Sequence, residues 1–181
     1  MPNWCMNAVV IRPLDEGGAV LLEKVAETRE GLLNALVPMP EAIRNTTAPQ
    51  PDPNLAHTLT EQYGYPDWYD WAVGKWGTKW DVDDIHSDWL PNEGEYGTFK
   101  AVFNTAWAPP IEAFAAVLDR FYIEAAYWEP GMCFCGYWCN GEQVEDGSPA
   151  SPDDARARFP EADARLSIGE DMEEWARLAE E

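Results

Sequence analysis

The stretch from residue 96 to residue 144 places the strongest constraint on the fold, because strand and helix patterns alternate along it. Its first part has the alternating aromatic and β-branched side chains of a strand. Pro109-Pro110 then begins a segment in which Phe114, Val117 and Phe121 recur at helical spacing. The predicted elements are a strand (Tyr96–Trp107), a helix (Ile111–Tyr122) and two strands joined by a turn (Ile123–Glu129 and Met132–Val144).

The earlier part of the chain predicts a strand, two helices and a second strand. Five prolines interrupt residues 37–60, which is typical of an irregular excursion. After it, a helix is predicted to begin near Pro66, with Asp67 at its positive dipole end and Gly77 at its end. The predicted elements are a strand (Cys5–Arg12), a helix (Val20–Ala26), a helix (Tyr65–Lys75) and a strand (Thr78–Ile85).

The order of these elements indicates a fold class. If the helices before residue 77 form one crossover, the order is β-α-β-β-α-β with an extra strand. We therefore predict an α+β fold of the ferredoxin-like split βαβ type: an antiparallel sheet with helices on one face, an extra C-terminal strand and an acidic tail. The domain would span residues 1–146, including the Pro-rich excursion at 37–60. Residues 147–181 would be a loosely attached tail, and their sequence leaves open a short helix at Met172–Leu178.

The charge of the chain indicates its partner. The 33 acidic residues against 12 basic ones give a net charge of −21, which repels nucleic acid and anionic membranes and attracts basic proteins. The acids are clustered, with six in residues 81–95 and thirteen in residues 142–181. Direct binding of nucleic acid would need a basic face, and the lysines form no cluster. The residues predicted to bind a partner are Asp81, Asp83, Asp84, Asp88, Glu93 and Glu95.

Composition and chain ends indicate a packed protein in the cytoplasm. Ten tryptophans and a hydrophobic content of 46% are enough for a core, so we do not expect disorder throughout. No apolar stretch approaches the ~20 residues of a membrane span. The N-terminus lacks the basic and apolar regions of a signal peptide. We expect a cytoplasmic protein, no membrane partner and reduced cysteines.

Three runs of residues carry a resemblance to a known family. They are Pro2-Asn3-Trp4-Cys5-Met6-Asn7, the run Tyr63–Trp71 (YGYPDWYDW) and Trp76-Gly77-Thr78-Lys79-Trp80-Asp81. They resemble the YubB-like proteins of phages, prophages and plasmids over about residues 1–140, the third run being the most specific. The resemblance implies a ferredoxin-like domain encoded by a mobile element. It supplies no catalytic residues.

Two groups of residues have the chemistry of metal ligands. They are Cys133, Cys135 and Cys139, with Cys5 as a fourth ligand, and separately Asp84, His86 and Asp88. Zinc sites usually have Cys-x₂₋₄-Cys knuckles on turns, whereas the three neighbouring cysteines share one parity on a predicted strand. Small buried side chains on a strand face explain them as well. A histidine in an acidic loop is typically solvated. We therefore assign no metal ligands.

No pattern indicates a reaction. The chain lacks phosphate-binding loops and the Gly-x-Ser-x-Gly elbow, and its carboxylates are too numerous to single out a pair. We therefore predict no catalytic residues and no cofactor. The tryptophans between residues 68 and 107 suggest a stacking or carbohydrate platform. Base stacking works together with positive charge, which is missing, so we expect most of these side chains in the core.

The leading functional hypothesis is a non-enzymatic, mobile-element-encoded interaction protein. Its carboxylates would occupy the nucleic-acid groove of a basic host defence protein of CRISPR or restriction type, by DNA mimicry. The alternative is a metal-dependent enzyme or binding module that uses the Cys133/Cys135/Cys139 group or the Asp84/His86/Asp88 group. A third hypothesis is that acidity serves only solubility in a structural module, and the sequence leaves homo-oligomers open.

Overall fold

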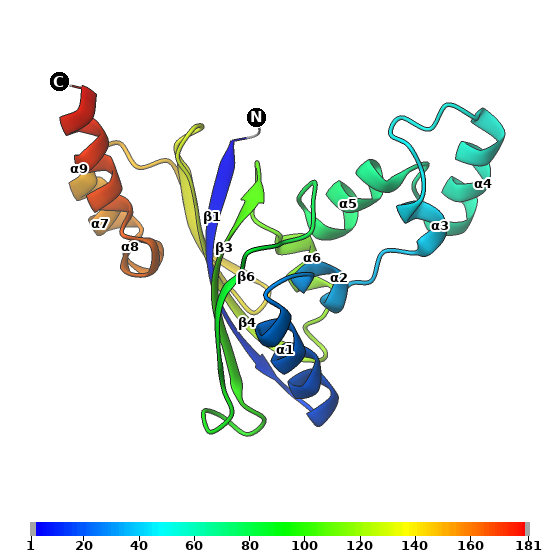
Figure 1. Ribbon diagram of the computed structural model, residues 1–181. Helices are drawn as coiled ribbons and strands as arrows, with labels where there is room; N and C mark the ends of the chain where they lie inside the picture. The colour runs from blue at the N-terminus through cyan, green and yellow to red at the C-terminus, as the bar shows by residue number, and fades with distance from the viewer. Residues whose placement is uncertain (1–2, 180–181) are drawn as a thin grey trace.

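The computed structural model describes residues 3–179, and these contain a six-stranded antiparallel sheet with helices on both faces (Figure 1). The strands lie in the order β2-β3-β1-β4-β5-β6, with β1 between β3 and β4. The predicted α+β class is confirmed. The strands are β1 (Trp4–Pro13), β2 (His86–Leu90), β3 (Thr98–Ala106), β4 (Phe121–Glu129), β5 (Phe134–Cys139) and β6 (Glu142–Gly147).

Strand β1 organises the sheet because it pairs along its length on both sides. Val9, for example, lies opposite Ala101 of β3 and Ala125 of β4. Successive side chains of a strand point to opposite faces. Val9 therefore joins one hydrophobic core, whereas its neighbour Ala8 joins a second core on the other face.

The larger core covers the first face of the sheet. Figure 1 shows α1, α2 and α6 against the sheet, with α3 and α4 farther away. Local signals set the ends of these helices: Asp15 caps α1 by accepting a hydrogen bond from the Gly18 N–H at 2.6 Å, and Gly77 ends α5 with φ 83°. The helices are α1 (Glu16–Thr28), α2 (Leu32–Leu36), α3 (Glu41–Arg44), α4 (Pro53–Tyr63), α5 (Trp68–Trp76) and α6 (Ile111–Ala115).

The second face carries the C-terminal helices α7 (Pro152–Arg158), α8 (Pro160–Leu166) and α9 (Ile168–Ala179). Phe159 and Ile168 are buried against Trp128 of β4 in a separate core. The prediction of helices on one face is therefore wrong. The predicted loose tail is instead three helices whose apolar side chains cover the second face.

Other predicted elements differ because tertiary packing overrides local pattern. The excursion at 37–60 contains α3 and most of α4, which runs on to Tyr63. The predicted helix 111–122 ends at Ala115, because β4 begins at Phe121. No strand forms over 78–85. The predicted strand 132–144 is two strands joined by a turn at Asn140-Gly141, where both residues have positive φ. Within residues 3–179, no helix is long and apolar enough to cross a membrane.

Candidate functional site

The acid-rich segments of the sequence provide the two outer strands of the sheet. Residues 81–95 contain β2, and β6 contains Glu142, Glu145 and Asp146. Charged side chains on an edge strand discourage pairing with another sheet. Part of the clustering of acids therefore has a structural reason.

Two of the six acids predicted to bind a partner are used within the protein. The Asp81 carboxylate accepts hydrogen bonds from the backbone N–H groups of Leu33 at 2.8 Å and Asn34 at 3.1 Å, at the start of α2. Burial raises the pKa of Asp81, against the effect of its N–H donors. Glu93 pairs with Lys100 at 2.9 Å. Neither carboxylate is free to bind a partner without loss of an internal contact.

Replacement of Asp81 by alanine is expected to lower the free energy of unfolding by about 1–2 kcal/mol, because it removes the cap of α2. Urea denaturation measures this loss. The matched control is Asp83→Ala, since Asp83 is exposed and its replacement should change stability by less than about 0.5 kcal/mol. Equal losses in the two variants would show that Asp81 has no special structural role.

Three of the remaining acids lie just before β2 or on it. Asp83, Asp84 and Asp88 are exposed, and within residues 3–179 they form no ion pair. Asp84 has φ 56°, a left-handed conformation that aspartate tolerates better than most residues, and it leads the chain into β2. Glu95 lies apart from them in the turn between β2 and β3, next to Tyr96, whose pKa it raises.

These three aspartates lie along a groove on the second face of the sheet, which we call the sheet groove. It consists of two adjoining hollows of about 220 and 320 Å³ that share His86 and Val102. Helix α8 packs on β4, β5 and β1 and forms one wall. The groove is lined by β1 (Trp4, Met6, Ala8, Val9 and Val10), by β2 and the residues before it (Asp83, Asp84, His86 and Asp88), by β3 (Lys100–Asn104) and by α8 (Arg165).

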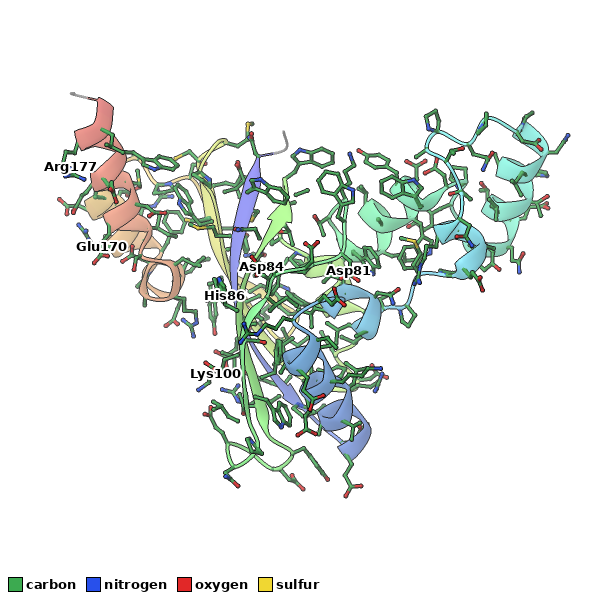
Figure 2. The ribbon with its side chains drawn as sticks, viewed as in Figure 1. Asp81, Asp84, His86, Lys100, Glu170 and Arg177 are labelled. Carbon is green, nitrogen blue, oxygen red and sulfur yellow. The ribbon has the colours of Figure 1, made fainter. Side chains whose placement is uncertain are left out.

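The sheet groove has an apolar floor and an excess of negative charge. Val102 and Trp4 are 46% and 48% exposed. Both cations that line the groove already have carboxylate partners: Lys100 pairs with Glu93, and Arg165 pairs with Glu161 and Glu124. Figure 2 shows Asp84, His86 and Lys100 following one another along the sheet, whereas Asp81 lies on the side of α2. The three unpaired aspartates therefore set the charge of the groove.

The structure does not bring the four cysteines together. Cys135 and Cys139 share a face of β5 but are four residues apart, which is about 13 Å along a strand. Cys5 lies on the opposite face of the sheet, beside Thr105. Burial raises the pKa of the Cys135 thiol to about 12, which disfavours the thiolate that binds zinc.

The Asp84, His86 and Asp88 side chains are also spread along the groove, since Asp84 and Asp88 line different hollows. Across residues 3–179, no three His, Cys, Asp or Glu side chains are arranged to hold a metal ion. Chemistry in the groove would thus depend on hydrogen bonds and charge from separate side chains.

Sequence patterns did not reveal the floor of the groove or the contribution of α8. One signal was present for the floor. Side chains alternate between the faces of a strand, so Val102 had to lie on the face opposite to that of Phe99 and Phe103. Arg165 gave no such signal, because its place depends on the packing of α8 against the sheet.

Comparison with known proteins adds little to this geometry. No protein-family model and no curated protein sequence matches the chain. Among solved structures, it is similar to api92 from Yersinia pseudotuberculosis, a protein assigned to the DUF1281 family. The TM-score is 0.44 at 11% sequence identity, over 82% of this chain and 98% of api92. We draw no functional argument from a likeness of this size, and the resemblance to YubB-like proteins stays a prediction.

Proposed function

We propose that this protein is a non-enzymatic interaction protein that binds a basic segment of another protein in the sheet groove. The observation that carries the proposal is the set of three unpaired aspartates above an apolar floor. Lysine or arginine side chains of the partner would meet Asp83, Asp84 and Asp88, while its apolar side chains would cover Val102 and Trp4. Such an arrangement combines burial of apolar surface with complementary charge.

The partner we propose is a nucleic-acid-binding protein, and binding competes with nucleic acid. Proteins of that class carry the basic surfaces that a net charge of −21 attracts over long range. B-DNA carries one charge per ~1.7 Å of its axis, so a mimic must present many carboxylates on one side. Helix α9 adds the exposed Glu170 beyond the groove, whereas Glu173 and Glu174 already pair with Arg156 and Arg177. The resemblance to YubB-like proteins supports a mobile-element inhibitor of host defence of CRISPR or restriction type.

We also propose that β1 to β4 form a ferredoxin-like unit. Their order along the chain, with the intervening helices, is β-α-β-β-α-β, and their order in the sheet is β2-β3-β1-β4. Both agree with a split βαβ arrangement. Strands β5 and β6 and helices α7 to α9 would then be additions at the β4 edge, and α8 would supply the wall of the groove.

The test is capture of a DNA-binding protein by the immobilised chain. The material is a lysate fraction of the source organism that binds DNA-cellulose, applied at low and at high salt. We expect a basic protein to be retained at low salt and released by salt or by duplex DNA. The triple variant Asp83→Asn/Asp84→Asn/Asp88→Asn should bind the captured protein about tenfold more weakly, or about 1.4 kcal/mol.

The matched control is Glu23→Gln/Glu27→Gln/Glu30→Gln, which makes the same change in charge on and after α1, with exposed residues. It should retain the captured protein. Equal weakening in both triple variants would mean that total charge, not the groove, attracts the partner. If the aspartate variant self-associates but still binds the captured protein, the role of these acids is instead to prevent the edge strand from pairing with another sheet. Stoichiometric zinc in protein purified without added metal would favour the metal-dependent alternative.

A further inference from the structure

Another hollow, of about 480 Å³, has a different chemistry from the sheet groove, and we call it the aromatic pocket. It lies where the start of α5 meets the end of β3. Two of the runs that carry the family resemblance meet here, since Tyr63–Trp71 and Trp76–Asp81 both contribute residues. The side chains that matter are Trp68, Tyr69 and Trp107, with Lys79, Asp67 and Asp70.

Local hydrogen bonds hold the aromatic rings in place. The buried Asp67 carboxylate accepts hydrogen bonds from the backbone N–H groups of Tyr69 and Asp70, both at 3.0 Å, and so fixes the first turn of α5. The backbone N–H of Trp68 donates to the Thr46 hydroxyl at 2.9 Å. The Tyr69 ring meets Trp68 edge-on at 5.9 Å. The wall formed by α5 is therefore preformed.

Trp107 adjoins the α5 wall and has an unusual backbone conformation. Its φ is 70°, in the left-handed region that a bulky residue rarely adopts. Its backbone N–H donates to the Asn3 carbonyl at 2.9 Å, which helps to fix that conformation. The side chain is 41% exposed and its ring lies 6.4 Å from that of Tyr69. Backbone strain that leaves a tryptophan exposed at a hollow points to a binding role.

Lys79 supplies a hydrogen-bond donor beside these rings. Its Nζ lies 4.3 Å from the Trp80 ring centre, 5.3 Å from that of Trp107 and 5.7 Å from that of Tyr69. In the part of the chain that the structure describes, this ammonium has no carboxylate within ion-pair distance. Because this ammonium already lies over these three rings, a second cation beside them would be repelled, and the pocket is not a cage for a cationic ligand.

The charges of the pocket select the class of ligand. Asp67 and Asp70 outnumber Lys79, and the protein as a whole carries a net charge of −21, so an anion such as a nucleotide would be repelled. A sugar ring has a C–H face of partial positive charge that suits the negative face of an aromatic ring, and the Trp68 ring of this pocket is not among those that Lys79 covers. Its hydroxyls can donate to carboxylates and accept from the ammonium. We propose that the aromatic pocket binds one ring of a neutral saccharide.

The test follows the indole N–H signals in ¹H–¹⁵N NMR spectra while maltotriose, cellotriose or triacetylchitotriose is added separately. At least one of these sugars should shift the Trp68 and Trp107 signals. Each signal is assigned by the variant in which that one tryptophan is replaced, because its signal disappears from the spectrum. Trp107→Ala should weaken its binding about tenfold, or about 1.4 kcal/mol. Asp70→Asn, a change at an exposed position, should weaken it as well without removing a ring.

The matched control is Trp175→Ala, because Trp175 is also exposed, at 46%, but lies on α9. It should leave the affinity unchanged, and the spectrum of each variant shows whether it is folded. The proposal is overturned if none of the three sugars shifts these signals. It is also overturned if glucose 6-phosphate binds more tightly than the neutral sugars, or if Trp107→Ala and Asp70→Asn both retain full affinity.

Discussion

Replacement of Phe159 by alanine is expected to lower the free energy of unfolding of helices α7 to α9 by about 3–5 kcal/mol, the usual cost of removing a buried aromatic ring. Phe159 is 2% exposed and belongs to the core that joins these helices to the second face of the sheet. The packing around it is tight, because a Cβ at Gly147 would lie 3.0 Å from its ring. The cavity left by alanine could not be filled without movement of β6 or α8.

Hydrogen exchange measures this effect helix by helix. Amides of α7 to α9 should lose protection, whereas those of β1 should keep it, since β1 pairs with both β3 and β4. The control is Leu178→Ala on α9, because Leu178 is 55% exposed and its loss should cost less than about 0.5 kcal/mol. A small, equal effect in both variants would mean that the C-terminal helices are only loosely attached.

Phe159→Ala also tests whether the sheet groove depends on the second core. Arg165 of α8 lines the groove, and the core around Phe159 contributes to the packing of α8 on the sheet. Release of α8 would open one wall, so Phe159→Ala should also weaken capture of the basic partner. The aromatic pocket has no residue from these helices, and its sugar binding should survive.

Elements with strong local signals could be predicted from the sequence. Helix α5 begins where Asp67 accepts hydrogen bonds from its first N–H groups, and it ends at Gly77 with positive φ. Strand β1 was predicted within a residue at each end, because it contains the run Val9-Val10-Ile11 of β-branched side chains. In such places local propensity and tertiary structure agree.

The C-terminal helices could not be predicted in the same way. Their buried residues, among them Ala155, Phe159 and Ile168, are few and are spread over three short helices between acidic residues. These side chains are buried because they pack against the second face of the sheet, and the local sequence does not show that contact. The predicted helix 111–122 failed for a related reason. Phe114, Val117 and Phe121 are all buried, but Phe121 enters the core as the first residue of β4.

The site shows the same limit of sequence patterns. Asp81 and Asp83 are nearly adjacent and chemically identical, yet Asp81 caps a helix 48 residues away along the chain and Asp83 faces the groove. Composition could show that the acids are clustered, but it could not separate structural carboxylates from those available to a partner.

Replacement of Glu124 by glutamine is expected to lower the free energy of unfolding by about 2–3 kcal/mol at neutral pH, because it removes the charge from a partly buried network. Glu124 accepts hydrogen bonds from Arg12 at 2.7 Å, from Arg165 at 3.1 Å and from the Tyr137 hydroxyl at 2.9 Å. This network lies on the second face and joins β1 and β4 to α8. The matched control is Glu161→Gln, because Glu161 is 50% exposed and pairs with Arg165 within one helix, an interaction worth about 0.3–0.5 kcal/mol.

The dependence of this loss on pH separates charge from shape. Burial by itself raises the pKa of Glu124, but the hydrogen bonds from Arg12, Tyr137 and Arg165 outweigh it, and the pKa is lowered from its ordinary value of 4.5. A lowered folded-state pKa means that the stabilisation is complete above pH 4.5 and is lost as pH falls through the folded-state value. Denaturation across this acid range should therefore show the parent protein approaching the stability of Glu124→Gln. A difference that stays constant as Glu124 becomes protonated would assign the loss to altered packing, and the attachment of α8 would then not depend on the charge of Glu124.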